Sequence, residues 1–381
     1  MFDYLIVGAG FAGSVIAERL ASQKNAKVLV VEKRNHIGGN CFDYKDENNI
    51  IIHKYGPHLF HTNNKKVFEY LSQFTEWNIY NHEVLAFIDG KKVPLPFNFN
   101  TLYELFPVSL AAQYEKKLLE KYPLNTRVPI LELKQSADKD LAVLADYIYE
   151  KIFLNYTAKQ WGKKPEEIDN FVTARVPIFI GKDNRYFNDI YQVVPKHGYT
   201  RLFENMLNNP NIKLMLNTNF KEIATIKNEQ IYIFGNKFNG PIIYTGCIDE
   251  LFDYRFDELP YRSVNMKFEI VQKEWYQEKA TVNYPNSYNF TRITEFKHIH
   301  PCNSKNTTIL KEYPTDYIIG KNEPYYPVFT EETQEKYQKY VDYAKRFPNI
   351  KFVGRLAEYK YYDMDDIVER ALEVVEKELD V

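Results

Sequence analysis

The chain has 381 residues, which is enough for two or three domains with a substantial core. Its formal net charge is −2, so the bulk charge gives no reason to expect nucleic acid or a membrane surface as a partner. No apolar run approaches the ~20 residues that span a bilayer. Three widely separated cysteines lack metal-ligand spacing and fit a reducing compartment, so we expect a cytoplasmic protein without a metal.

The first stretch, residues 2–40, has the pattern of a nucleotide-binding unit. An apolar strand from Tyr4 to Val7 breaks at the sequence GAGFAG, after which a helical period begins. Gly8 allows the tight turn, Gly10 lets backbone N–H groups approach a pyrophosphate, and Gly13 lets the helix lie close to the strand. The helix then presents its N-terminus, where the dipole favours negative charge, to the phosphates.

A second unit of the same kind follows directly. The buried strand Lys27 to Val31 ends at Glu32, at about the spacing expected for a carboxylate that accepts the ribose hydroxyls. A further glycine turn, Gly38-Gly39-Asn40, exposes backbone where an NAD domain does not need it, which favours the longer cofactor FAD. This opening resembles the FAD-binding flavoproteins of the glutathione-reductase and amine-oxidase type.

The next segments bring histidines towards this site. Residues 50–63 read as a strand that enters a Gly-Pro turn with His58 and His61 beside it. Single histidines are more often structural, but two that flank such a turn are placed to line the isoalloxazine ring. Residues 84–93 alternate as a hairpin that turns at Asp-Gly.

The middle of the chain changes period. Residues 101–121 and 137–161 have helical patterns with few glycines, and we expect an inserted helical domain. Aromatic residues near the end of the second pattern, including Tyr156 and Trp161, either pack in a core or flank a base and its ribose. Residues 162–185 carry prolines, a glycine and charges of both signs, which predicts a mobile loop.

The remaining patterns complete a mixed α/β fold. We expect a Rossmann-like FAD-binding domain with an inserted helical domain and an antiparallel β-sheet substrate domain. The expected boundaries are 1–78, 198–250 and 351–381 for the FAD domain, 98–165 for the helical domain, and 79–97, 166–197 and 251–350 for the sheet domain, with the mobile loop at about 163–185.

Motifs along the whole chain resemble those of UDP-galactopyranose mutases. The motifs are GAGFAG, EKRNHIGGN, HKYGPHLFHTN, YTAKQWGKKPEEI, ARVP, RYFND, KHGYT, YTGCIDELFDYRF, FTRITEFKH, KEYP, EPYYPV and GRLAEYKYYDMD. The resemblance implies an FAD isomerase that interconverts UDP-galactopyranose and UDP-galactofuranose for cell-surface polysaccharide biosynthesis. It also implies that N5 of reduced flavin attacks the anomeric carbon, UDP leaves, and the flavin-bound sugar recloses as the other ring. An external reductant such as NAD(P)H and a homodimer are expected with it.

The same matching assigns the site residues. Arg175 and Arg292 are expected to be the catalytic residues, because expulsion of UDP needs cations beside the diphosphate and arginine binds phosphate oxygens bidentately. The expected substrate-binding residues are these two with His82, Tyr156, Thr157, Trp161, Tyr186, Phe187, Tyr326 and Tyr361. The expected cofactor-binding residues are Gly8, Gly10, Phe11, Gly13, Glu32, Lys33, Gly39, Asn40, His58, Leu59, His61, Arg355, Asp363 and Met364.

Some positions depart from the pattern of that family. Phe179 stands where the motif often carries a second loop arginine, Val193-Val194 replaces a pair that usually contains glycine, and Cys247 replaces a usual proline. These changes leave the sugar open, and UDP-N-acetylgalactosamine, UDP-arabinose or a deoxysugar nucleotide are alternatives. A flavin oxidoreductase and a non-catalytic nucleotide-sugar sensor are the alternatives in other functional classes.

Overall fold

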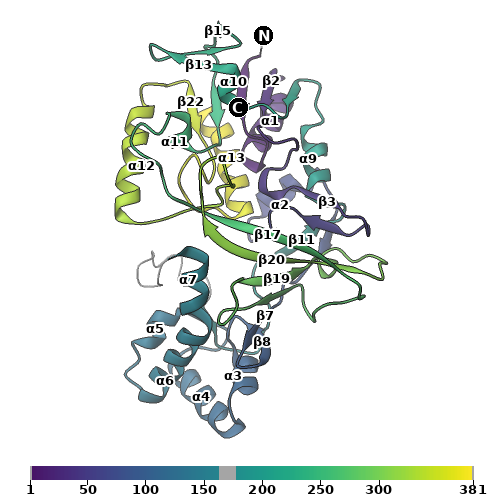
Figure 1. Ribbon diagram of the computed structural model, residues 1–381, viewed down its shortest axis with the longest axis vertical. Helices are drawn as coiled ribbons and strands as arrows, with labels where there is room; N and C mark the ends of the chain where they lie inside the picture. The colour runs from purple at the N-terminus through teal and green to yellow at the C-terminus, as the bar shows by residue number, and fades with distance from the viewer. Residues whose placement is uncertain (1, 163–176, 380–381) are drawn as a thin grey trace.

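The computed structural model describes residues 2–162 and 177–379. The chain is arranged in three regions along the long axis of the molecule (Figure 1). A parallel sheet with helices lies at one end, a long antiparallel sheet crosses the middle, and a group of helices lies at the other end. No helix within the described ranges combines the length and the apolar character needed to cross a bilayer.

The parallel sheet is built around the first strand of the chain. Its strands are β1 (Tyr4–Val7), β2 (Val28–Val31), β12 (Ile212–Met215), β16 (Ile242–Tyr244) and β22 (Ile350–Phe352), in the order β12-β2-β1-β16-β22. Alternate side chains face opposite cores, so Ile6 packs with α1 (Phe11–Gln23), α9 (Tyr199–Leu207) and α13 (Met364–Glu378), whereas Leu5 faces the other side. Because all pairs are parallel, the carboxyl ends of the strands meet at one edge. Open α/β sheets bind ligands at this edge.

The antiparallel sheet forms the middle of the molecule. Its strands are β7 (Val84–Ile88), β8 (Lys91–Leu95), β17 (Tyr261–Val271), β18 (Thr281–Asn283), β19 (Arg292–Glu295), β20 (Thr307–Asp316) and β21 (Tyr326–Pro327), in the order β21-β17-β20-β19-β18-β7-β8. One pair, β18 with β7, is parallel. The register between β19 and β20 sets Arg292 opposite Glu312.

Two smaller sheets border this middle region. They contain β5 (Phe60–Thr62), β11 (Tyr191–Pro195) and β6 (Trp77–Ile79), and the pair β9 (Arg127–Val128) and β10 (Ile178–Phe179). In the second sheet Phe179 is the antiparallel partner of Arg127.

The helical region has its own apolar core, which it shares with the β7-β8 hairpin. Its helices are α3 (Phe99–Leu105), α4 (Val108–Lys121), α5 (Ile130–Lys134), α6 (Lys139–Ile148), the π-helical segment η2 (Tyr149–Leu154) and α7 (Asn155–Trp161). The helical pattern over 101–121 is divided between two helices, because Phe106 before Pro107 is extended at φ −115° and ψ 153°. Proline disfavours the helical conformation at the residue before it, so α3 and α4 are separate helices.

The other elements complete the fold. They are β3 (Asp43–Lys45), β4 (Ile51–His53), α2 (Lys65–Leu71), α10 (Phe220–Ile223), β13 (Ala224–Lys227), β14 (Gln230–Ile233), β15 (Asn236–Lys237), α11 (Ile248–Leu251), α12 (Glu331–Ala344) and the 3₁₀ segments η1 (Gly39–Cys41) and η4 (Phe296–His298). These elements include two further small sheets, β13-β14-β15 and β3-β4. Together they confirm the mixed α/β fold that the sequence predicts. The division into three domains at the expected boundaries stays a prediction.

Candidate active site

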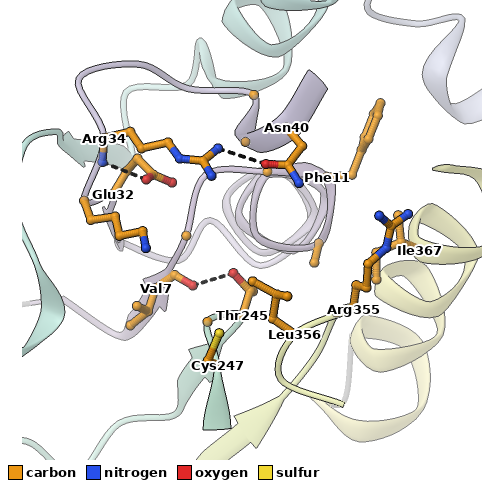
Figure 2. Close-up of a pocket in the computed structure, with 18 of the residues that line it drawn as sticks. Val7, Phe11, Glu32, Arg34, Asn40, Thr245, Cys247, Arg355, Leu356 and Ile367 are labelled. Carbon is orange, nitrogen blue, oxygen red and sulfur yellow. Dashed lines mark hydrogen bonds between the residues drawn. The ribbon is translucent and has the colours of Figure 1, made fainter. Parts of the chain in front are cut away.

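A cavity of about 250 Å³ opens at the carboxyl edge of the parallel sheet. Figure 2 shows that its walls come from the β1–α1 turn, the end of β2, the 38–41 turn and the segments around Thr245, Arg355 and Ile367. The expected cofactor residues that line it are Gly8, Gly10, Phe11, Glu32, Lys33, Gly39, Asn40, His58, Arg355, Asp363 and Met364. Gly13 lies outside this lining, while Leu59 and His61 line a neighbouring cavity.

The β1–α1 turn and the 38–41 turn lie against each other, and their glycines keep side chains out of the space where a phosphate would bind. A Cβ on Gly13 would lie 2.0 Å from the carbonyl oxygen of Gly8, so α1 can approach β1 this closely only with glycine at that position. A Cβ on Gly39 would lie 3.0 Å from Cα of Gly10. The N-terminus of α1 has no side-chain cap, so its N–H groups face the cavity without a side-chain acceptor.

Glu32 is held in place by backbone donors at the end of β2. Its carboxylate accepts hydrogen bonds from the N–H of Ala9 and from the N–H of Arg34, both at 2.9 Å. Only 6% of Glu32 is exposed. The Arg34 guanidinium in turn donates to Asn40 at 3.0 Å and to Glu323 at 2.8 Å. A buried, fixed carboxylate at this position fits a ribose, and the adjoining glycine turns fit a pyrophosphate, so the residues present fit a dinucleotide such as FAD.

A second cavity of about 610 Å³ lies between this site, the antiparallel sheet and α7. All described residues that we expected to bind substrate line it: His82, Tyr156, Thr157, Trp161, Tyr186, Phe187, Arg292, Tyr326 and Tyr361. Arg175 lies outside the described residues. The residues common to both cavities are Asn40, His58, Tyr325, Arg355, Asp363 and Met364. A ligand in the larger cavity therefore meets a ligand in the smaller one across this shared wall.

Arg292 is the central cation of the larger cavity. Its Nε donates to Oε1 of Glu312 at 2.6 Å, and the Glu312 side chain is 2% exposed. Burial alone would lower the pKa of Arg292, but the neighbouring Glu312 carboxylate, with Tyr156, raises the pKa above its ordinary value. The guanidinium is therefore charged at every physiological pH, and its direction is fixed by Glu312. The sequence analysis missed Glu312, which only the strand register places beside Arg292.

Aromatic rings surround this arginine. The rings of Tyr326 and Tyr361 are stacked with centroids 6.0 Å apart, and the guanidinium of Arg355 lies 4.8 Å from the Tyr361 ring. Trp161 lies 5.8 Å from Tyr326. Burial raises the pKa of Tyr156, so its hydroxyl keeps its proton. Such rings offer flat apolar surface and hydroxyl donors, which suits a base and a sugar.

The histidines of the site are neutral or paired. Burial lowers the pKa of His58 to about 4 and that of His82 to about 3, so neither carries a charge at pH 7. His61 contacts Asp189 at 3.1 Å and stacks on Phe187 at 3.7 Å between centroids. Among the described residues that line the larger cavity, the cations available for a diphosphate are therefore arginines.

A buried group behind His58 consists of Asp43, His53 and His300. Its ligand atoms lie close enough for a metal, but each has a partner. The Asp43 oxygens accept from the N–H groups of Tyr199 and Thr200, and His53 Nδ1 accepts the N–H of His58 at 2.9 Å. Nε2 of neutral His53 then carries the proton and donates to His300 Nε2 at 3.0 Å. Hydrogen bonds hold Asp43 and His53, while Nδ1 of His300 has no hydrogen-bond partner among the described residues. The group orients the backbone of His58.

Two cations fix helix α7. One is Arg262, on the antiparallel sheet, and the other is Lys159, on the helix itself. The Arg262 guanidinium donates to the carbonyls of Gln160 at 3.1 Å and Lys159 at 3.2 Å, at the C-terminal end of the helix. Lys159 Nζ donates to the carbonyls of Tyr284 at 2.5 Å and Tyr288 at 3.1 Å. Cations at a helix C-terminus are favourable, and these hold Trp161 against the cavity.

Comparison with known proteins places this site in one family. Residues 151–361 match the family model described as UDP-galactopyranose mutase, and residues 6–74 match that of an NAD(P)-binding Rossmann-like domain. The chain is 38% identical to UDP-galactopyranose mutase of Mycoplasma genitalium, over 96% of this chain and 92% of that protein. It is 33% identical to dTDP-fucopyranose mutase of Escherichia coli, over 98% of this chain and 97% of that protein.

Solved structures are similar in fold. A crystal structure of reduced UDP-galactopyranose mutase has a TM-score of 0.76 at 18% identity and covers 100% of this chain and 94% of its own. Cyclohexylamine oxidase from Brevibacterium oxydans has a TM-score of 0.58 at 13% identity, with 100% of both chains covered. The oxidase shares the architecture, whereas the family model and the mutase relatives also match the sequence over most of its length. On these grounds the chain belongs to the UDP-galactopyranose mutase family.

Proposed function

We propose that the protein binds FAD in the smaller cavity and interconverts UDP-galactopyranose and UDP-galactofuranose in the larger one. The observation that carries the proposal is the wall that the two cavities share, formed in part by His58, Arg355 and Met364. This wall would bring the anomeric carbon of a sugar to the flavin ring, while Arg292 meets the diphosphate. Reduced FAD, when bound, supplies the nucleophile for the anomeric carbon.

The residues of the chain supply binding and charge stabilisation. Tyr156, Thr157 and Trp161, on the fixed helix α7, would hold the uridine. Arg292 would stabilise the negative charge that grows on the departing UDP, because a charged donor directed at the leaving oxygen binds the transition state more tightly than the ground state. Arg175 is proposed for the same diphosphate. Neutral His58 and His82 would leave the charge balance to the arginines.

The departing UDP needs no acid partner from the chain in this scheme. Asp363, which lies at the N-terminus of α13, is shared by both cavities and is proposed to contact the cofactor. The positive end of that helix dipole would stabilise the anionic reduced ring. Because the reaction consumes no electrons, an external reductant such as NAD(P)H would be needed only to bring the enzyme into its active form.

A second candidate substrate is a deoxysugar nucleotide. The relative from Escherichia coli is named dTDP-fucopyranose mutase, and it is 33% identical to this chain over almost its whole length. Both candidates use the same diphosphate site and the same sugar ring chemistry. They differ at the base, at the 2′ position of the nucleotide pentose and at the sixth carbon of the transferred sugar.

One assay distinguishes these substrates. The purified protein is reduced with dithionite under anaerobic conditions and incubated separately with UDP-galactose and with dTDP-fucose, and the nucleotide sugars are separated by chromatography. A furanose product from UDP-galactose with the higher kcat/KM supports the proposal. A higher kcat/KM with dTDP-fucose assigns the deoxysugar instead. If neither substrate yields a furanose while the protein holds reduced flavin, both of these substrate assignments are wrong.

The redox state of the cysteines bears on where the enzyme works. The cysteines Cys41, Cys247 and Cys302 are free thiols, which fits the reducing cytoplasm and a role in making precursors of cell-surface polysaccharide. We propose a homodimer, as the resemblance implies. Light scattering of the purified protein at several concentrations tests the dimer directly, and a monomer of 45.2 kDa at all of them would contradict it.

A further inference from the structure

Arg127 is an arginine of the larger cavity that the sequence analysis did not single out. It lies on β9, in the helical region, and lines the cavity with Tyr186, Asn188 and Asp189. One Nη donates to the carbonyl of Tyr186 at 2.9 Å and to Oδ1 of Asn188 at 3.1 Å, so the guanidinium has a fixed position. Its Nε is buried and has no hydrogen-bond partner among the described residues.

The charge of Arg127 is only partly offset, because Asp189 and Asp183 attract it without forming an ion pair with it. No carboxylate in the described parts of the chain forms an ion pair with it, because Asp183 is paired with Arg185 and Asp189 is bonded to His61. Burial lowers the pKa of Arg127, and the attraction of Asp189 and Asp183 offsets this effect only in part. A buried, unpaired donor in a cavity wall is a place where a ligand can supply the missing acceptor.

The neighbouring strand β10 relates the position of Arg127 to that of Phe179. Phe179, where the related motif often carries an arginine, is the antiparallel partner of Arg127, and directly opposed residues lie on the same face of a strand pair. The Phe179 side chain is 6% exposed, whereas its neighbours Ile178 and Ile180 pack in the core of the helical region. The positive charge that Phe179 lacks is thus present one strand away.

The charged side chains that line the larger cavity indicate which kind of ligand Arg127 would bind. Three arginines line the described part of the larger cavity: Arg127, Arg292 and Arg355. Arg292 is neutralised by Glu312, and Arg355 lies in the wall shared with the cofactor cavity, where it donates to the carbonyls of Tyr325 and Tyr362. A nucleotide diphosphate carries at least two negative charges, and its charge is the feature that an unpaired guanidinium best complements.

We propose that Arg127 is a third diphosphate-binding arginine of this protein, which takes over the role of a cation at position 179. The inference rests on the proposed function, since it assumes that a nucleotide diphosphate occupies the larger cavity. It assigns a residue outside the pair Arg175 and Arg292 to the substrate, and it accounts for the departure from the family pattern at Phe179.

Binding of UDP and of uridine to the oxidised, flavin-loaded protein tests the inference by calorimetry. Arg127→Gln is expected to weaken UDP binding about 10- to 100-fold, the usual effect of losing one charge-assisted hydrogen bond, while uridine binding stays within about twofold. Arg127→Lys, which keeps the charge but not the planar fork, is expected to lie between. Arg185→Gln is the matched control, because Arg185 is nearby, exposed and paired with Asp183, and it should not change either affinity.

Two results would overturn the inference. If Arg127→Gln weakens UDP and uridine equally, the residue acts on the base or on the position of Tyr186 and not on the diphosphate. If UDP binding is unchanged, Arg127 has no part in substrate binding. Flavin content and thermal unfolding of each variant show that the fold is retained. A wild-type protein that binds no UDP would instead contradict the proposed function, which separates the two failures.

Discussion

Replacement of Arg292 by alanine is expected to damage stability as well as catalysis. The substitution leaves the Glu312 carboxylate, 2% exposed, without the donor that now lies 2.6 Å away. Removing one partner of a buried ion pair typically costs ~3–5 kcal/mol. Because the Arg292 side chain is 28% exposed to the cavity, we expect the lower end of that range, about 3 kcal/mol. Loss of turnover in this variant alone would therefore mix two effects.

A double variant separates them. Arg292→Met combined with Glu312→Gln removes both charges and keeps the approximate volume of each side chain, so no buried carboxylate is left unpaired. We expect its free energy of unfolding to return to within about 1 kcal/mol of the wild type, since replacing both partners of a buried pair is often nearly neutral. Turnover per bound flavin should stay lower by ~10²–10³, because the donor for the leaving diphosphate is still absent.

The assay is urea unfolding together with turnover normalised to flavin content, measured for both variants at one pH. If the double variant regains turnover along with stability, Arg292 serves the fold and not the leaving group. If Arg292→Ala unfolds at the same urea concentration as the wild type, the ion pair contributes nothing measurable and the reasoning from burial is refuted.

Three further outcomes are expected. The purified protein should be yellow and should release intact FAD on denaturation; a colourless protein that cannot be reconstituted with FAD would contradict the cofactor assignment. Oxidised protein should bind a UDP-sugar with negligible turnover, whereas protein reduced once and kept anaerobic should complete many turnovers; product limited to one equivalent per flavin would refute this. Stability should fall as the pH drops from ~6.5, the unfolded pKa of histidine, towards about 4, because burial lowers the folded-state pKa of His300 to about 4 and the unfolded chain therefore binds more protons in that range. In His300→Gln the slope of unfolding free energy against pH should be shallower by up to ~1.4 kcal/mol per pH unit, and an unchanged slope would exclude His300 as a cause.

The nucleotide-binding end of the chain could be predicted because its signals are local. Buried strands, a glycine turn and a helical period follow one another within residues 4–31, and the parallel register of β1 and β2 confirms them. The helical pattern over 101–121 shows the limit of such signals. Its apolar spacing continues on both sides of Pro107, although the proline separates two helices.

Contacts between distant segments had no comparable signal. His53 and His300 are 247 residues apart and meet only because β4 lies against η4. Arg127 belongs to a strand of two residues, which is too short to show a period. Leu59 and His61, expected beside the cofactor, line the larger cavity because β5 runs along its side. The roles of the expected site residues stay predictions, whereas their convergence on two adjoining cavities is a property of the fold.

The wall that the two cavities share has a thermodynamic consequence. Bound FAD would order Asn40, His58 and Arg355 and so raise the affinity for the nucleotide sugar by some factor. Coupling between two binding sites is reciprocal, so the nucleotide sugar must raise the affinity for FAD by the same factor. Protein stripped of flavin should therefore bind UDP more weakly than the loaded protein. In a cell rich in the nucleotide sugar, the substrate itself would slow the loss of the cofactor.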